Sequence, residues 1–184
     1  GVAPTATGNQ PLHVSAIIAA GGRGARFGAD RPKQLLVLGG LPILQRSIEA
    51  FTRSGAVQQI VVALPPELVA NPPVYLAKAG AHVALVEGGD RRQDSVARAF
   101  DRVALHSDIV VIHDAARPLV SADLIRRTID AAATHGAAIA ALPARDTVKR
   151  ADAQQMIAGT IPRAEIFLAQ APQAFRTHVL AEAP

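Results

Sequence analysis

Glycines and cations gather directly after the first apolar run of the sequence. That run ends at Ala20, and Gly21 and the stretch GRGARFGADRPK (22–33) follow it. Glycines after a strand let backbone N–H groups approach phosphate oxygens without obstruction from a Cβ. Four cations within 11 residues suit a triphosphate better than the two phosphates of a dinucleotide; a solvated basic loop is the alternative interpretation. These cations are Arg23, Arg26, Arg31 and Lys33.

Two common phosphate-binding loops do not match this stretch. A P-loop requires Gly-Lys-Ser/Thr four residues after its first glycine, and that sequence does not occur here. A dinucleotide fingerprint requires glycine where this chain has Phe27. A Rossmann oxidoreductase is therefore a poor interpretation of the loop.

A carboxylate ends another apolar run, DIVVIHD (108–114). Asp114 has no packing role at a strand end, and on local grounds alone it would be an N-cap of the next turn. We expect the neighbouring His113 to be a packed strand-end histidine, because the other histidines show no metal-site spacing with it.

A second glycine-containing turn follows the run HVALVE (82–87). Gly88, Gly89 and Asp90 open this turn, and Ser95 lies in the helical stretch after it. The pattern fits an ordinary β–α turn with a capping residue equally well as a turn that approaches a ligand closely.

The elements that carry these residues alternate regularly. Short aliphatic runs predict strands, and amphipathic stretches between them predict helices, of which the third has an N-cap at Ser121 and a stop at Gly136. This order predicts a doubly wound, Rossmann-like α/β domain with a mostly parallel sheet, whose ligands bind at the carboxyl ends of the strands. The runs are 14–20, 60–64, 82–87, 108–114 and 137–143, and the helical stretches are 43–55, 91–105 and 121–136.

The alternation stops at Asp146. Two extended pieces around a polar turn at 151–155 predict a projecting β-arm over about 144–162, and such hairpins often exchange between subunits. We therefore expect a homodimer through the arm. Residues 1–12 are expected to be a flexible leader, followed by one domain over 13–184.

Composition excludes several classes of protein. The 184 residues are 49% hydrophobic and 18% charged, which is too apolar for a disordered chain, and no run approaches a membrane span. With no cysteine, disulfides and thiol catalysis are excluded, and a cytoplasmic location is expected. Few aromatic residues accompany the net charge of +4, so we expect neither a nucleic-acid partner nor a membrane partner.

Four collinear segments carry a resemblance to a known family. They are AAGGRGARFG…PKQ (19–34), GGDRRQDSV (88–96), HDAARP (113–118) and DTVKR (146–150), with PRAE…QAPQAF (162–175) as a further match. Together they resemble the 2-C-methyl-D-erythritol 4-phosphate cytidylyltransferases, which have a fold of the nucleotide-diphospho-sugar transferase type. The resemblance implies that the phosphate of a polyol phosphate attacks the α-phosphorus of CTP and releases pyrophosphate.

The resemblance also implies residue roles. Arg26 and Lys33 would stabilise the transition state, Arg163 would anchor and position the substrate phosphate, and Arg117 and Thr147 would contact the same substrate. Asp114 would bind Mg²⁺, for which another divalent cation is the alternative. The nucleotide would contact Ala19, Ala20, Gly21, Gly22, Gly24, Gly88, Asp90, Ser95 and Ala115.

The sequence departs from the family pattern in two places. Ala171 stands where the family usually has threonine, and relatives continue beyond the position of Pro184 to a second metal-binding aspartate and a lysine. We therefore expect a truncated chain or part of a longer one, such as a fusion with a cyclodiphosphate synthase. Ribitol-5-phosphate cytidylyltransferase and a non-catalytic nucleotide-binding protein of the same fold remain the alternatives.

Overall fold

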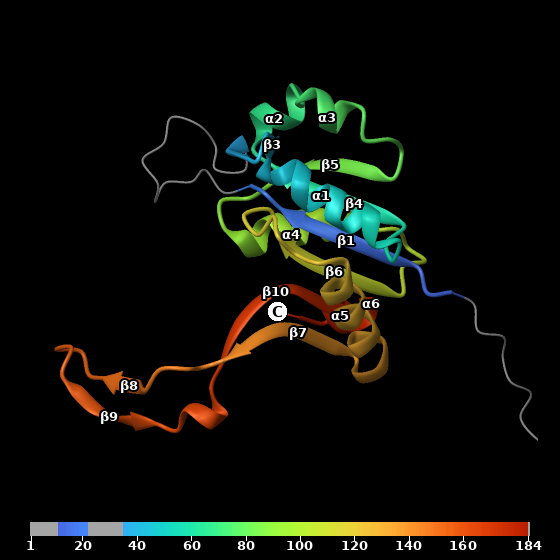
Figure 1. The fold of residues 1–184 in the computed structure, drawn as a ribbon. Helices are drawn as coiled ribbons and strands as arrows, with labels where there is room; N and C mark the ends of the chain where they lie inside the picture. The colour runs from blue at the N-terminus through green and yellow to red at the C-terminus, as the bar shows by residue number, and fades with distance from the viewer. Residues whose placement is uncertain (1–10, 22–34, 184) are drawn as a thin grey trace, which may run out of the picture.

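The computed structural model describes residues 11–21 and 35–183 and is built on a central sheet (Figure 1). Within these residues the six-stranded sheet has the order β5-β4-β1-β6-β10-β7. Neighbours among β5, β4, β1 and β6 are parallel, and β10 runs antiparallel to β6 and β7. This confirms the predicted mostly parallel α/β fold. The strands are β1 (Val14–Ala19), β4 (Gln59–Leu64), β5 (Val83–Glu87), β6 (Ile109–Asp114), β7 (Ala137–Pro143) and β10 (Phe167–Arg176).

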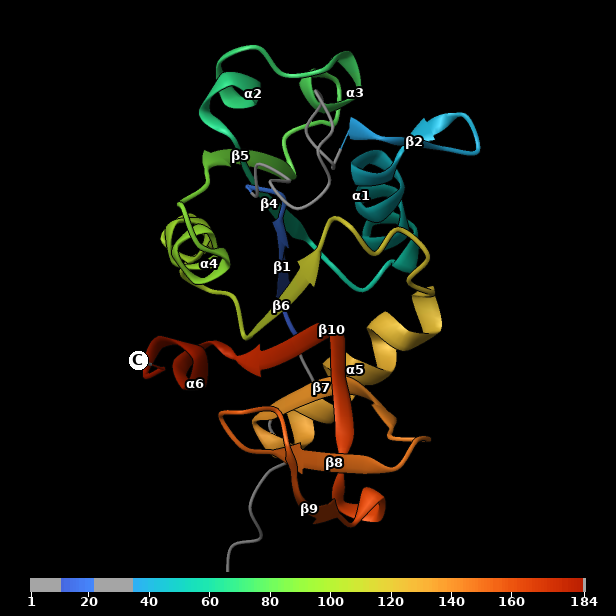
Figure 2. The same ribbon diagram turned by 90° about the vertical axis from the view of Figure 1, so that its left-hand side faces the viewer.

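Helices cover both faces of this sheet (Figure 2). On one face lie α1 (Ile43–Ser54) and α5 (Ala122–His135), and on the other lie α4 (Arg92–Phe100) and the short α6 (Thr177–Ala181). Near β5 the chain forms two short helices, α2 (Pro66–Ala70) and α3 (Val74–Ala77), and a small ribbon of β2 (Val37–Leu38) and β3 (Leu41–Pro42) precedes α1. No described helix has the length and apolar character needed to cross a membrane.

Alternate residues of the strands fill two separate cores. In β1, Ala16 and Ile18 pack with Phe51 of α1 and Ile125 of α5, whereas Ile17 points to the other face. Burial on both faces explains why the strands are continuous apolar runs and not alternating ones.

The helix boundaries follow the predicted signals in part. Ser121 accepts a hydrogen bond from the Leu124 N–H at 3.1 Å and so caps α5, and the chain leaves that helix at Gly136 with φ of 90°. The prediction of one helix over 91–105 is wrong at its end, because α4 stops at Phe100. From there the N–H groups of Arg102 and Val103 bond to carbonyls three residues back, which tightens the chain into a turn before β6.

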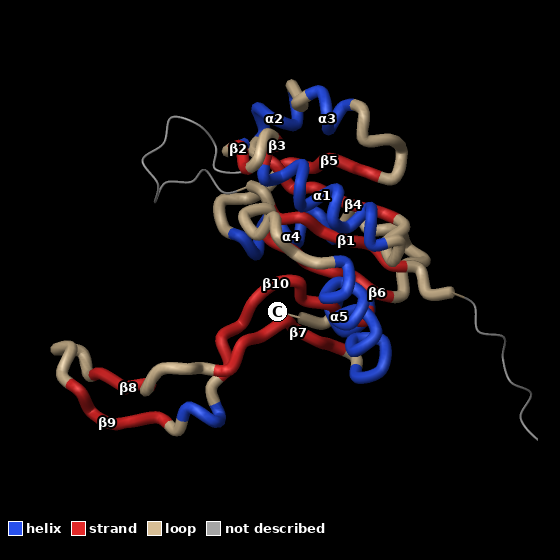
Figure 3. Tube along the Cα trace, viewed as in Figure 1, coloured by secondary structure: helices blue, strands red, loops and turns tan. Residues whose placement is uncertain are grey.

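The arm consists of a hairpin that projects away from the sheet (Figures 1 and 3). It pairs β8 (Val148–Ala151) with β9 (Ile157–Ile161), and a single 3-10 turn, η2 (Arg163–Glu165), leads back to β10. The Asp152 carboxylate accepts from the N–H groups of Gln154 and Met156 and stabilises the hairpin turn. The projecting arm is therefore confirmed.

The sequence did not reveal strand β10. Pro172 lies in its middle, and a proline within an apolar run argues against a sheet strand because it cannot donate to the ladder. The register of β10 against β7 shifts between Ala169 and Gln173, so the strand accommodates the proline at that irregularity.

Candidate functional site

The carboxyl ends of the parallel strands meet at one edge of the sheet. Ala19 at the end of β1 lies opposite Asp114 at the end of β6, and Leu64 of β4 lies opposite Glu87 of β5. Because Gly21 and Gly88 follow the ends of β1 and β5 and Asp114 is the last residue of β6, the fold brings these three residues to one edge. Their neighbour Ala115 is fixed by its backbone: its N–H donates to the Ala19 carbonyl at 3.1 Å, and its carbonyl accepts from Ser47 at 3.1 Å.

Two glycines allow the turns after β1 and β5 to touch. A Cβ added at Gly88 would lie 2.9 Å from the Cα of Gly21, and one added at Gly21 would lie 2.7 Å from the Ser95 hydroxyl oxygen. The Gly88 N–H donates to the Leu64 carbonyl at 2.7 Å, which holds this turn against β4. Gly21 and Gly88, both partly exposed, therefore lie in direct backbone contact at this edge.

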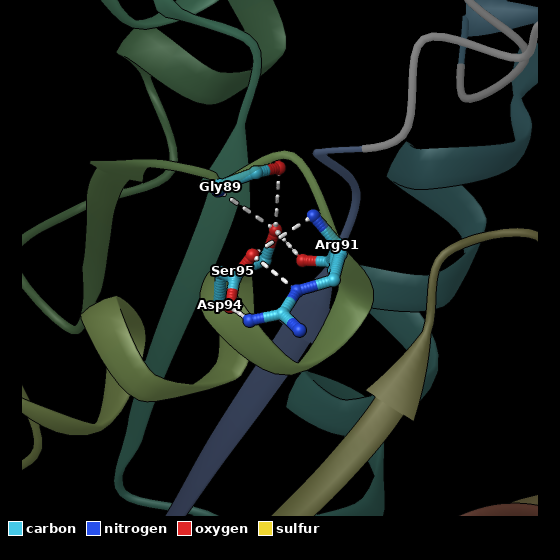
Figure 4. A network of polar contacts seen from close by, with 4 residues as sticks. All are labelled: Gly89, Arg91, Asp94 and Ser95. Atoms are coloured by element: carbon cyan, nitrogen blue, oxygen red, sulfur yellow. Dashed lines mark hydrogen bonds and ion pairs between the residues drawn. The ribbon is translucent and has the colours of Figure 1, made fainter.

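A network of polar contacts organises the turn before α4 (Figure 4). Ser95 is buried, and its hydroxyl accepts from the Gly89 N–H at 3.0 Å. The Asp94 carboxylate accepts from the Arg91 backbone N–H at 3.1 Å and from its guanidinium at 2.8 and 3.0 Å. These bonds to Arg91 lower the pKa of Asp94. The Ser95 hydroxyl therefore fixes the turn itself, whereas Asp90 is exposed.

Asp114 lies between two cations. The Arg92 Nε donates to Asp114 Oδ1 at 2.7 Å, and the Arg117 Nε lies 3.5 Å from Oδ2. Arg117 also donates to the side chain of Gln170 in β10. The cluster therefore joins α4, β6, the loop after β6 and β10 at the carboxyl ends of the parallel strands.

His113 is fully buried beside this cluster, as expected of a packed histidine. Its Nε2 donates to the Arg117 carbonyl at 3.0 Å, and its ring centre lies 5.1 Å from that of Phe51. Burial lowers the pKa of His113, and Nδ1 finds no hydrogen-bond partner among the described residues. Burial thus favours the neutral form of the ring, and the ring supports the Arg117 loop through this hydrogen bond.

The predicted arm residues lie outside this cluster. Thr147 precedes β8, and Arg163 lies in η2, where its guanidinium donates to the Arg145 carbonyl at 2.8 Å. Both residues are exposed and belong to the arm, which projects away from the sheet (Figure 1). Gly22, Gly24, Arg26 and Lys33 fall outside the described residues.

Sequence reasoning missed two members of the cluster. Arg92 was included only as part of the GGDRRQDSV segment and Gln170 only as part of the QAPQAF segment, and neither residue was given a role. A usable signal existed for Arg92, because a cation in the first turn of a helix is unfavourable unless a carboxylate compensates it. No comparable signal existed for Gln170, because its position depends on the unpredicted β10.

A parallel sheet with backbone-lined turns and a charged cluster at its carboxyl edge defines an α/β protein of the nucleotide-binding type. Residues 14–184 match the family model described as "IspD: 2-C-methyl-D-erythritol 4-phosphate cytidylyltransferase". The chain therefore belongs to this family, which makes it a member of a family of nucleotidyltransferases.

Individual relatives agree with this assignment. The chain is 43% identical over 171 residues to 2-C-methyl-D-erythritol 4-phosphate cytidylyltransferase of Frankia casuarinae, covering 92% of this chain and 63% of that protein. It is 40% identical over 168 residues to the bifunctional enzyme IspD/IspF of Desulfotalea psychrophila, covering 91% of this chain and 43% of that protein. The chain thus spans between 43% and 63% of the length of these two curated relatives.

The fold has a matching solved structure. The crystal structure of 2-C-methyl-D-erythritol 4-phosphate cytidylyltransferase from Thermus thermophilus superimposes with a TM-score of 0.72 at 36% identity. The match covers 93% of this chain and 74% of that one.

Proposed function

We propose that this protein transfers a cytidylyl group from CTP to 2-C-methyl-D-erythritol 4-phosphate in isoprenoid precursor synthesis. The substrate phosphate attacks the α-phosphorus of CTP, the bond to the β-phosphate oxygen breaks, and pyrophosphate leaves. One observation carries the proposal: in a chain of this family, the Gly21–Gly88 contact and the cationic cluster around Asp114 lie at the same sheet edge.

In this proposal the backbone binds the nucleotide, and positively charged side chains stabilise the transition state. The two touching turns present N–H groups to the ribose and phosphates, and Arg26 and Lys33 stabilise charge on the pentacoordinate phosphorus. Both partners are anionic, so catalysis depends on positioning and electrostatics and requires no protein nucleophile. The proposed nucleotide contacts are Ala19, Ala20, Gly21, Gly22, Gly24, Gly88, Asp90, Ser95 and Ala115.

Asp114 would bind one Mg²⁺ ion together with oxygen ligands from the nucleotide phosphates in this proposal. Mg²⁺ in nucleotide sites is usually bound by one or two carboxylates together with substrate phosphates and water. Asp114 supplies such a carboxylate at a strand end, and no group of three or more potential metal ligands occurs in residues 11–21 and 35–183. The ion would neutralise charge on the triphosphate, and Asp114 would orient it.

The substrate side of the site requires a second subunit in this proposal. Thr147 and Arg163 bind the polyol phosphate, and Arg117 contacts the same substrate from the strand-end cluster. Because the arm projects away from its own cluster, a homodimer that exchanges arms would deliver the first two residues. Exposed Met156 and Ile157 near the arm's tip support such a contact. The cytoplasmic location expected from the cysteine-free sequence is part of this proposal.

A pyrophosphate-release assay tests the function. The protein is incubated with CTP, Mg²⁺ and one phosphate at a time from a panel of methylerythritol, ribitol and other sugar phosphates. We expect release with methylerythritol phosphate and much slower release with the others. Release with ribitol phosphate alone would establish the other cytidylyltransferase activity, and no release with any of them would favour a non-catalytic binding protein.

Lys33→Ala tests the proposed electrostatic mechanism. Loss of one charge-stabilising donor should lower kcat by about 100-fold or more. Lys78→Ala is the matched control, because Lys78 is an exposed lysine at the end of α3 and should leave the rate unchanged. If Lys33→Ala keeps more than about a tenth of the wild-type rate, the assigned role is wrong.

A further inference from the structure

Two adjacent arginines at the start of α4 bind different carboxylates. Arg91 pairs with Asp94 of its own helix at 2.8 Å, whereas Arg92 reaches Asp114 at the end of β6. Cations are unfavourable at a helix N-terminus, so each needs a nearby carboxylate to compensate it. The pairing of Arg91 explains the local helix start, but the pairing of Arg92 connects this helix to the residue expected to bind the metal.

Both oxygens of the Asp114 carboxylate face a guanidinium group. Arg92 Nε lies 2.7 Å from Oδ1, and Arg117 Nε lies 3.5 Å from Oδ2. A divalent cation bound to Asp114 would sit about 2.1 Å from one of these oxygens and hence within a few ångströms of both guanidinium groups. Like charges at that separation repel, so the cation would have to displace Arg92 or bind against this repulsion.

A triphosphate reverses this balance. It carries several negative charges, which attract the cation and can also accept hydrogen bonds from a displaced guanidinium. Divalent cation and nucleotide therefore favour each other's binding at this sheet edge, and the cation alone is disfavoured.

From this geometry we propose that Arg92 is a positioning residue that holds the Asp114 carboxylate and excludes free divalent cations. A metal ion then reaches Asp114 only together with the phosphates of the nucleotide. The inference rests on the proposed function for the identity of the nucleotide, but the exclusion of free cations needs no turnover.

Paramagnetic broadening by Mn²⁺ tests the exclusion directly. Mn²⁺ prefers the same oxygen ligands as Mg²⁺ and broadens amide signals near its binding site. ¹⁵N-labelled wild-type protein and Arg92→Gln are titrated with Mn²⁺ in the absence of nucleotide, and broadening is followed at Ala115 and Ala116. We expect Arg92→Gln to reach half-maximal broadening at about one fifth of the wild-type Mn²⁺ concentration or less, because one repelling charge is removed.

Three further variants separate this effect from a general loss of charge. Arg91→Gln removes the same charge one residue away and should behave as wild type. Arg92→Lys keeps a cation and should stay within about twofold of wild type. Adding Asp114→Asn to Arg92→Gln should abolish the gain. The proposal would be overturned if Arg92→Gln and Arg91→Gln reached half-maximal broadening at the same Mn²⁺ concentration. It would also be overturned if the gain in Mn²⁺ binding survived Asp114→Asn.

Titrations with nucleotide present test the coupling. Adding CTP should increase the apparent Mn²⁺ affinity of the wild type by a larger factor than that of Arg92→Gln; equal factors would contradict the coupling. If the phosphate panel releases no pyrophosphate but Arg92→Gln still gains Mn²⁺ binding, the proposed function fails and the role of Arg92 stands. If pyrophosphate is released but Arg92→Gln shows no such gain, the role of Arg92 fails and the proposed function stands.

Discussion

The contact between Gly21 and Gly88 sets the spacing of two turns at the sheet edge. A Cβ at Gly88 would lie 2.9 Å from the Gly21 Cα and 3.0 Å from the Ser95 hydroxyl, and real Cβ atoms are rarely so close to backbone atoms. The turn after β5 cannot yield easily, because the Gly88 N–H is bonded to the Leu64 carbonyl and the Gly89 N–H to the Ser95 hydroxyl. The backbone surface proposed for the nucleotide therefore depends on the absence of two side chains.

Gly88→Ala should separate the two turns. We expect the free energy of unfolding to fall by about 1–3 kcal/mol, as in other overpacked sites, and CTP binding to weaken. Urea unfolding and a CTP titration measure the two effects. Gly159→Ala in the arm is the control, because a Cβ there meets only the end of Arg150 at an ordinary 3.6 Å. Unchanged stability of Gly88→Ala would show that the turns can shift.

His113 makes the stability depend on pH. Burial lowers the pKa of His113 in the folded state below the ordinary value of 6.5. As the pH falls, His113 therefore binds a proton more readily in the unfolded chain than in the folded protein. Stability is therefore lost as the pH falls below about 6.5, by up to about 1.4 kcal/mol per pH unit from this residue.

A His113→Gln variant should remove part of this dependence, because the glutamine amide can still donate to the Arg117 carbonyl but does not titrate. Urea unfolding at pH 7.5 and 5.5 should give a smaller loss in the variant than in the wild type. The pKa of His13 is lowered as well, chiefly by burial, but that residue is present in both proteins and cancels in the comparison. Equal losses would mean that His113 is protonated without cost.

Between elements, Arg126 joins α5 to α1. Its Nε and Nη2 donate to the Ser54 carbonyl at 3.0 and 2.7 Å, at the C-terminus of α1, where a cation is favourable. Arg126→Gln should lower the free energy of unfolding by about 1 kcal/mol, measured by urea unfolding.

Arg127 provides the comparison one residue away. It pairs with Asp123 at 3.4 Å, and both side chains are well exposed, so Arg127→Gln should cost less than about 0.5 kcal/mol. Equal losses for the two variants would show that the contact with Ser54 contributes little.

The elements also show what the sequence could predict and what it could not. The apolar runs of β1, β4, β5 and β6 were visible because both faces of a parallel strand are buried, and Ser121 and Gly136 marked the ends of α5 by local chemistry. Strand β10 depends on pairing with segments far away in sequence, and Pro172 obscured it. The site shows the same contrast between local and long-range information. Its strand-end residues were predictable from the fold class, whereas the partners of Asp114 depend on side-chain geometry. The roles of the site residues remain predictions.

At the scale of the whole molecule, the arm should make the protein a dimer. Light scattering after size exclusion should give about twice the chain mass of 19.1 kDa. Ile157→Asp should give a single chain, because a charge replaces an apolar side chain that is 69% exposed on the arm. Its activity should fall as well, since Thr147 and Arg163 would no longer reach the partner's site.

A second apolar surface residue controls for the added charge. Val74 in α3 is 66% exposed at the other side of the sheet, and Val74→Asp should leave the mass unchanged. A wild-type mass of one chain at the concentration of the assay would contradict the dimer.

The position of β10 inside the sheet has a consequence for synthesis of the chain. Among the described strands, β7 pairs only with β10, although β7 is made first and residues 144–166 separate the two. A ribosome adding about 5–20 residues per second needs roughly one to five seconds for that stretch. During this interval the apolar strand β7 has no neighbour to complete its hydrogen bonds, so the nascent chain offers chaperones a strand that the finished protein holds in its sheet.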